Sequence, residues 1–149
     1  MKWLAVVLTL LAVPAHGAVR VIDGDTLDVD GTRVRLWGID APEGKQTCQR
    51  DGVAWLCGQE AAKALREFLS GKQIACETKD IDRYKRQVSV CRVGPIEVND
   101  WLTRQGWALD YRQYSKGIYA DAENEARNAK RGLWAGKFTP PWEWRRNKR

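Results

Sequence analysis

Histidine and long apolar runs are the two features that this sequence of 149 residues has least of. The longest mainly apolar run, Trp3 to Val13, covers eleven residues, whereas a helix needs about 20 residues to span a bilayer. The composition is 44% hydrophobic and 30% charged. These values are typical of one globular domain with a real core, and they exclude collagen-like, disordered and multi-span membrane chains.

The apolar run has the arrangement of a secretory signal. Lys2 precedes it, and the small-x-small pattern Ala15-His16-Gly17 follows it. We therefore predict a signal peptide over residues 1–17, cut between Gly17 and Ala18, in preference to a buried N-terminal strand. Cleavage removes His16, the one histidine. Catalytic triads, histidine acid–base catalysis and histidine-ligated zinc are then excluded, so carboxylates, Lys, Tyr or Arg must carry any chemistry.

Positive charge is concentrated at the end of the chain. Residues 18–149 hold 24 basic and 19 acidic side chains, and residues 137–149 alone contribute a net +4. We divide the chain into the signal peptide, a body over 18–136 and a basic tail over 137–149, in which Pro140-Pro141 favours an extended or flexible arm. A polyanionic partner would bind mainly through this tail, although many basic tails only increase solubility. We expect no catalytic residue in it.

The four cysteines form an even set, which in an exported chain favours two disulfides over free thiols. Three connectivities are possible. We favour Cys48–Cys57 with Cys76–Cys91, because Cys76 and Cys91 lie in two alternating apolar runs that would form a hairpin centred between residues 83 and 84. The spacing contains no C-x-x-C, which disfavours a zinc site.

Alternation and turn residues predict a small barrel with helices packed on it. The expected strands cover residues 19–23, 25–30, 32–39, 73–78 and 87–93, with a short extension through 97. The expected helices cover residues 59–70, 99–105 and 120–131. A turn at Asp30-Gly31 would place Thr26 opposite Arg35. The order predicts an α+β fold, mainly β: a five-stranded Greek-key oligonucleotide/oligosaccharide-binding (OB) barrel with three packed helices.

Polar side chains gather in three short segments, 22–26, 35–43 and 82–86. Asp25 and Asp40 are hard oxygen donors of the kind that Ca²⁺ takes, and arginines in the last two segments suit bidentate phosphate binding. Each residue alone has an ordinary interpretation as a turn residue, a surface arginine or a solvated loop carboxylate. Strict alternation also puts Asp25 and Arg35 on opposite sheet faces, so a site containing both requires a bulge or a strong twist.

The combination of these segments is more specific than any one of them. Asp-Gly-Asp-Thr at residues 23–26 is followed by Arg-x-x-x-x-Asp-x-Pro-Glu, which begins ten residues after Asp25, and by Asp-x-Tyr-x-Arg at 82–86. This pattern resembles the staphylococcal nuclease family. The resemblance covers residues 19–134 and includes Val98-Asn99 and the segment from Lys130 to Trp134.

The resemblance implies roles for particular positions. Asp25 and Asp40 would bind calcium together with the main-chain carbonyl of Ala41, where the best-known members have Thr. Arg35 and Arg86 would bind phosphate, and Glu43 would be the general base. The positions that match nucleotide-phosphate contacts are Arg83, Tyr84 and Tyr114, whereas Tyr111 has no assigned role. Lys85 and Gln87 replace glycines that are common in the family, which bears on the turn that presents Arg86.

The sequence therefore predicts a secreted or periplasmic, monomeric, calcium-dependent nuclease that acts on DNA and RNA with little sequence preference. The resemblance implies 3′-phosphate products, and single-stranded or unpaired regions are the expected substrates. One alternative is a non-catalytic single-stranded nucleic-acid binder on the same OB barrel, which would need neither Glu43 nor a calcium site. The other is an exported interaction module that docks through the Pro-Pro-Trp-Glu-Trp segment.

Overall fold

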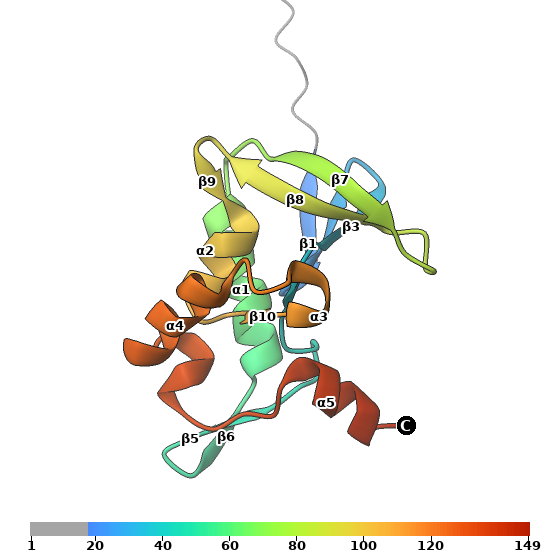
Figure 1. The fold of residues 1–149 in the computed structure, drawn as a ribbon. Helices are drawn as coiled ribbons and strands as arrows, with labels where there is room; N and C mark the ends of the chain where they lie inside the picture. The colour runs from blue at the N-terminus through green and yellow to red at the C-terminus, as the bar shows by residue number, and fades with distance from the viewer. Residues whose placement is uncertain (1–17) are drawn as a thin grey trace, which may run out of the picture.

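The computed structural model describes residues 18–149, so the predicted signal peptide and its cleavage site lie outside the described residues. The fold is α+β, with strands in one mixed sheet and two small two-stranded sheets (Figure 1). None of the helices in residues 18–149 is both long enough and apolar enough to cross a membrane.

The strands and helices follow the sequence pattern in most of the body. The strands are β1 Val19–Asp23, β2 Thr26–Val29, β3 Thr32–Leu36, β4 Ile39–Asp40, β5 Cys48–Arg50, β6 Val53–Trp55, β7 Ala75–Ile81, β8 Gln87–Val93, β9 Ile96–Glu97 and β10 Leu109–Asp110. The helices are α1 Cys57–Leu69, α2 Val98–Arg104, α3 Arg112–Ser115, α4 Ala120–Asn128 and α5 Pro141–Asn147, with a 3-10 turn η1 Gly132–Ala135.

The main sheet has the order β1-β2-β3-β8-β7, with β9 paired to β8. Neighbours are antiparallel except β3 and β8, which run parallel. The predicted hairpin register is confirmed, because Thr26 pairs with Arg35. Closure of this sheet into a five-stranded barrel stays a prediction. Residues 18–149 contain five α-helices, whereas we expected three.

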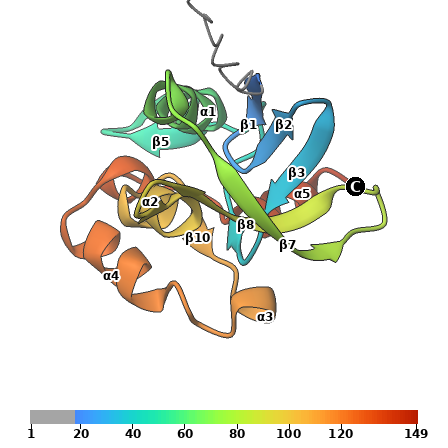
Figure 2. The ribbon, with the colours of Figure 1, turned by 90° about the horizontal axis from the view of Figure 1, so that it is seen from above.

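The main core lies between the inner face of the sheet and the helices α1 and α2. It contains apolar side chains from both layers: Leu27, Val34, Leu36, Leu65, Leu69, Val98 and Leu102. Helix α1 presents a residue to this core at every turn, and the chain leaves it through Gly71 at φ +70°. Figure 2 shows the sheet strands on one side and α2, α3 and α4 on the other.

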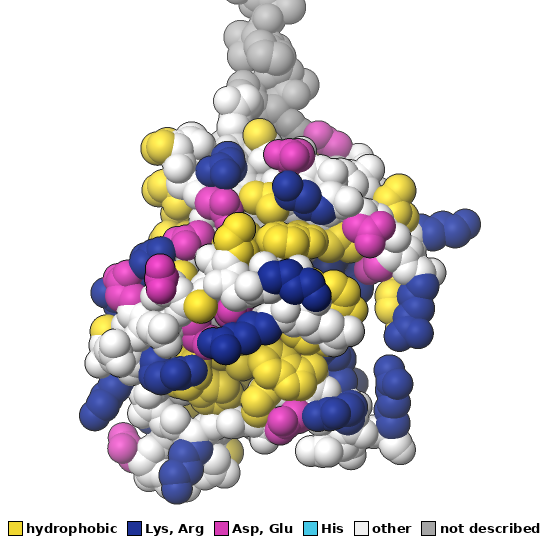
Figure 3. Space-filling model, in the orientation of Figure 1, with side chains coloured by type: hydrophobic (Ala, Val, Ile, Leu, Met, Phe, Trp, Pro, Cys, Tyr) yellow, Lys and Arg dark blue, Asp and Glu magenta, His cyan; other side chains and the backbone are white. Residues whose placement is uncertain are grey.

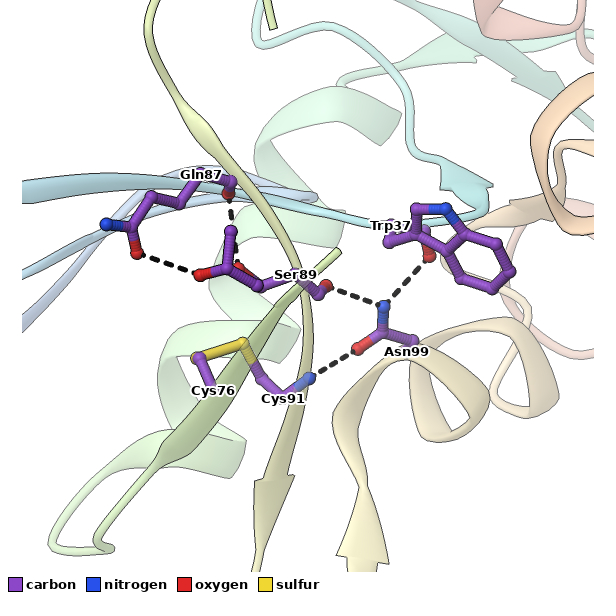
Figure 4. The surroundings of a disulfide bond; sticks show 7 residues. Trp37, Cys76, Gln87, Ser89, Cys91 and Asn99 are labelled. Carbon is purple, nitrogen blue, oxygen red and sulfur yellow. Dashed lines mark hydrogen bonds between the residues drawn. A yellow bond between two sulfur atoms is a disulfide. The ribbon is translucent and has the colours of Figure 1, made fainter. Parts of the chain in front are cut away.

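Both predicted disulfides are present, Cys48–Cys57 and Cys76–Cys91. Cys76 and Cys91 are direct cross-strand partners in β7 and β8, as the hairpin prediction required. Next to this bridge, the fully buried Asn99 links three elements (Figure 4). Its Oδ1 accepts from the Cys91 amide at 3.1 Å, and its Nδ2 donates to the carbonyls of Trp37 and Ser89 at 2.9 and 3.2 Å. Asn99 thus fixes the end of β3 against β8 and α2.

The end of the chain differs from our expectation. Residues 141–147 form helix α5, whereas we expected an extended or flexible arm. Pro141 stands at the start of this helix, where a missing amide hydrogen costs nothing. A second apolar cluster holds the segment in place: Trp134, Phe138 and Trp142 pack against Leu109, Leu133 and the Cys48–Cys57 disulfide. The aromatic side chains near the end of the sequence therefore belong to a core, which is why the segment is ordered.

Candidate active site

Asp25 lies in the turn between β1 and β2, directly beside the end of β4. The register of β1 shifts between Val21 and Asp23, and residues 24 and 25 form the turn, so strand alternation does not apply to Asp25. Its Oδ2 accepts the Ala41 amide at 2.7 Å. Gly24 permits this approach, because a Cβ at residue 24 would meet the Ala41 Cβ at 2.8 Å. The departure from strict alternation that a site with both Asp25 and Arg35 required is therefore present.

Arg35 connects the two aspartates. Its Nη1 donates to the carbonyls of Leu36 and Ile39 at 2.8 and 3.0 Å and lies 3.3 Å from the Asp25 carboxylate. Its Nη2 donates to Asp40 Oδ1 at 3.2 Å. Burial disfavours the charged guanidinium, but the charges of Asp25 and Asp40 outweigh burial and raise the pKa of Arg35. Arg35 is thus a fixed positive charge between two carboxylates.

The carboxylates in this region are crowded. Burial, and then the charge of Asp25, raise the pKa of Asp23 from 3.8 to about 7. Burial also raises the pKa of Asp40 to about 6, although its hydrogen bond with Arg145 opposes that rise. Burial is the main cause of both shifts, and the charge of Asp25 adds to each of them. The crowded carboxylates also favour binding of an additional cation, which would relieve the repulsion.

Glu43 lies on a loop that Gln46 holds in place. The Glu43 amide donates to Gln46 Oε1 at 3.2 Å, and the Gln46 amide donates to the Glu43 carbonyl at 2.8 Å. Gln46 is 1% exposed, and its Nε2 also donates to the Thr139 carbonyl at 2.8 Å. Gly58, at the start of α1, allows close packing, since a Cβ there would meet the Glu43 carbonyl oxygen at 1.8 Å. The backbone of Glu43 is therefore fixed, while its side chain remains one-third exposed.

Asp25, Arg35 and Glu43 line a cleft, and the hairpin between β7 and β8 lines the same cleft. Asp82 accepts the amides of Tyr84 and Arg86 at 2.9 and 3.0 Å and the Arg86 Nε at 2.7 Å. Lys85 takes a left-handed conformation at φ +61°, a backbone conformation that glycine adopts more readily than lysine. The guanidinium groups of Arg83 and Arg86 lie 5.2 and 5.3 Å from the Tyr84 ring centroid.

Helices α3 and α5 complete the cleft. Tyr114 is 54% exposed, and its ring meets that of Tyr111 edge to face at 4.9 Å. Tyr111 in turn stacks on Trp142 of α5, with centroids 5.2 Å apart and planes 8° apart. In Figure 3, basic side chains gather on the side where the β7–β8 hairpin and α5 face one another, with hydrophobic side chains exposed beside them.

The tail also contributes a side chain to the site, contrary to our expectation. Arg145 Nη1 and Nη2 donate to the two carboxylate oxygens of Asp40 at 2.9 and 2.8 Å. Nη1 also donates to Glu43 Oε1 at 2.7 Å. The charges of Asp40 and Glu43 overcome the burial of Arg145 and raise its pKa. Asp40 itself is 0% exposed, and its carboxylate accepts hydrogen bonds from both Arg145 and Arg35.

The predicted ligands are of the type that a hard cation prefers, but they are fewer than the six to eight oxygens that Ca²⁺ takes. Asp25, Asp40 and the carbonyl of Ala41 supply oxygen donors only, which suits Ca²⁺. Within residues 18–149, no group of three or more His, Cys, Asp or Glu side chains is placed to hold a metal ion. A cation here would therefore depend on water and substrate oxygens, and it would have to compete with Arg145 for Asp40.

The structure brings most of the predicted residues to one cleft. The residues that line it include Asp25, Arg35, Glu43, Arg83, Tyr84, Arg86 and Tyr114. Asp40 and Ala41 lie directly behind this surface, buried.

Three contributors were missed: Asp23, Gln46 and Arg145. Asp23 stood in a segment that we had already singled out. The tandem Arg145-Arg146 after two tryptophans was visible in the sequence, but nothing there placed it beside residue 40.

The cleft and the buried residues behind it thus combine two aspartates, a fixed arginine and a glutamate with further arginines, whose forked guanidinium groups suit phosphate binding. The similarity of this sequence to known proteins identifies its family. The family model described as staphylococcal nuclease homologue matches residues 33–136, so the chain belongs to the staphylococcal nuclease family.

Similar proteins carry more than one kind of name. The "Succinoglycan biosynthesis protein ExoI" of Rhizobium meliloti (strain 1021) is 42% identical over 126 residues, 83% of this chain and 66% of that protein. An "Uncharacterized endonuclease" of Escherichia coli O157:H7 is 34% identical over 160 residues, 99% of both chains. The "Micrococcal nuclease" of Shigella flexneri is 32% identical over 165 residues, 95% of this chain and 89% of that protein.

Proposed function

We propose that this chain is an exported, calcium-dependent nuclease that hydrolyses phosphodiester bonds in DNA and RNA with little sequence preference and leaves 3′-phosphates. One observation carries the proposal: ion pairs connect Asp25, Arg35, the buried Asp40 and, through Arg145, Glu43. The cleft that Asp25, Arg35 and Glu43 line is also lined by Arg86, Tyr84 and Tyr114. Family membership and the names of two relatives support nuclease activity. The two disulfides support export, because such bonds persist in oxidising compartments.

The residues divide the work by their chemistry. Glu43 is one-third exposed and accepts the proton of an attacking water. No histidine is present in residues 18–149 to take this role instead. Arg35 and Arg86 bind the phosphate oxygens, and they bind them more strongly as negative charge builds in the transition state. Calcium held by Asp25, Asp40 and the Ala41 carbonyl would supply charge neutralisation and orient the phosphate.

The cleft is open enough for a flexible strand. Tyr84 and Tyr114 are 64% and 54% exposed, and flat aromatic rings can stack with unpaired bases without selecting a sequence. The basic side chains around the cleft attract the backbone of either nucleic acid. We therefore propose single-stranded or unpaired regions of DNA and RNA as the substrates of a monomeric enzyme.

The test is hydrolysis by residues 18–149 with both disulfides oxidised, on single-stranded and double-stranded DNA and on RNA. We expect cleavage in calcium, none in excess chelator, and products that carry 3′-phosphates by end-group analysis. Tight binding of single strands without hydrolysis in calcium would instead support the non-catalytic binder. Absence of both activities would favour the interaction module.

A further inference from the structure

The contacts of Arg145 point to a role that the proposed reaction does not use. In the structure, every carboxylate oxygen of the two candidate calcium ligands already accepts a donor from the protein. Asp25 Oδ1 accepts from the Thr26 hydroxyl at 3.1 Å, and its Oδ2 accepts from the Ala41 amide. Asp40 Oδ1 accepts from both Arg35 and Arg145, and its Oδ2 accepts from Arg145.

A cation and the Arg145 guanidinium require the same oxygens. Arg145 takes both oxygens of Asp40 in a fork and extends to Glu43, the proposed base. Since Arg35 is fixed by two backbone carbonyls, Arg145 is the donor that can leave. Its side chain is 34% exposed, and it belongs to a short helix of seven residues that directly follows Pro140.

The position of Arg145 does not result from a free tail resting on the surface. Trp142 stacks on Tyr111, and the segment before α5 pairs with β5 through Gln49 and Lys137. Gln46, which holds the Glu43 loop, donates to Thr139 just before Pro140. The body of the protein therefore delivers α5 to the site through contacts that do not involve Arg145.

We propose that Arg145 takes the place of the cation on Asp40 and Glu43 and closes the site until calcium displaces it. This inference rests on the proposed function, since it concerns the same calcium ligands. In the closed state, Arg145 compensates the crowded carboxylates and keeps Glu43 paired. When Arg145 leaves, Asp40 is available to the cation and Glu43 is available to water. Binding of calcium and docking of Arg145 oppose each other, and the opposition is reciprocal.

The test is calcium binding by calorimetry without substrate, on residues 18–149 and on the variants Arg145→Gln and Arg146→Gln. Arg146→Gln is the matched control, because it removes the same charge from the adjacent position, where the side chain is 71% exposed and pairs only loosely with Glu143 at 3.9 Å. We expect Arg145→Gln to bind calcium roughly ten-fold more tightly than the unaltered protein, within the usual range of coupling between sites. Arg146→Gln should stay within about two-fold, because Arg146 pairs with Glu143 and not with Asp40 or Glu43, and its exposed charge is largely screened.

Hydrogen exchange gives an independent readout of displacement. Calcium should accelerate exchange of the α5 amides, 142–147, in the unaltered protein, and the effect should be smaller in Arg145→Gln. Equal or weaker calcium binding by Arg145→Gln, relative to Arg146→Gln, would overturn the inference while leaving a calcium-dependent nuclease intact. If none of the three proteins bound calcium, the proposed calcium function would fail and the inference with it. Circular dichroism must show that all three share one fold.

Discussion

Replacing Asp23 with Asn should stabilise the calcium-free protein, although Asp23 lines the candidate active site. Asp23 lies beside Asp25, whose amide it accepts at 3.2 Å, and an Asn side-chain oxygen can accept the same bond. The change removes one of several crowded negative charges. Arg35, the nearby cation, remains paired with Asp25 and Asp40.

The size of the effect follows from the pKa of Asp23, which is about 7 in the folded protein against an ordinary value of 3.8. Between these pH values the folded protein holds a proton that the unfolded chain has lost, so the free energy of unfolding falls as pH rises through this window. The full difference between the two pKa values corresponds to about 4 kcal/mol, at 1.36 kcal/mol for each pKa unit. Because Asp23 borders an open cleft, we expect about half of that, about 2 kcal/mol, from Asp23→Asn at about pH 8. Below about pH 4 both states are protonated, and the gain should vanish.

The assay is urea denaturation in excess chelator at several pH values. Asp121→Asn is the control, because it removes an acidic charge from an exposed position on α4. A variant Asp23→Asn that is no more stable than the unaltered protein at about pH 8, or equally stabilised at about pH 4, would refute the argument that carboxylates are crowded at this site.

Three further predictions concern the arginine, a disulfide and the tail. Arg35→Lys keeps the charge but loses the forked guanidinium that reaches Asp40 and two carbonyls, so kcat should fall by about 10²-fold. Steady-state kinetics measures this, with circular dichroism as the check on the fold. A near-normal kcat would show that Arg35 has no part in the mechanism. The double change Cys76→Ala and Cys91→Ala opens a loop with a sequence separation of 15 residues and should lower the free energy of unfolding by about 3 kcal/mol. Denaturation of the oxidised proteins measures this, and a loss below about 1 kcal/mol would contradict it. Truncation after residue 136 removes a net charge of +4 and should flatten the salt dependence of substrate binding. Because Arg145 contacts Asp40 and Glu43, truncation should also change calcium affinity, and an unchanged affinity would argue that the tail acts on substrate alone.

The strands and helices of the body could be predicted because local signals specify them. Asp30-Gly31 sets the register of β2 and β3, and the two cysteines of the β7–β8 hairpin set the pairing of those strands. The short strands β4 and β10 could not be predicted in the same way. Each has two residues, and they form by pairing with one another across about 70 positions of sequence.

The candidate site shows the same division between local and distant information. The family resemblance made it possible to recognise the site from the spacing of four residues in the sequence, Asp25, Arg35, Asp40 and Glu43. Arg145 reaches Asp40 across a sequence separation of 105 residues, and its position depends on an aromatic cluster that packs α5 onto the body. Composition alone presented that segment as a charged tail, because a pattern of tryptophans does not reveal which surface the rings will contact.

The assignment of Glu43 as the base is tested most directly by the turnover of Glu43→Gln at saturating nucleic acid and calcium, measured beside calcium binding by calorimetry. Gln keeps the volume of Glu43 and an oxygen that can accept from Arg145, but it does not take up a proton at neutral pH. We expect a loss of at least about 10²-fold in kcat with calcium and nucleotide binding largely preserved. Near-normal turnover by a correctly folded Glu43→Gln would contradict the assignment of Glu43 as the base.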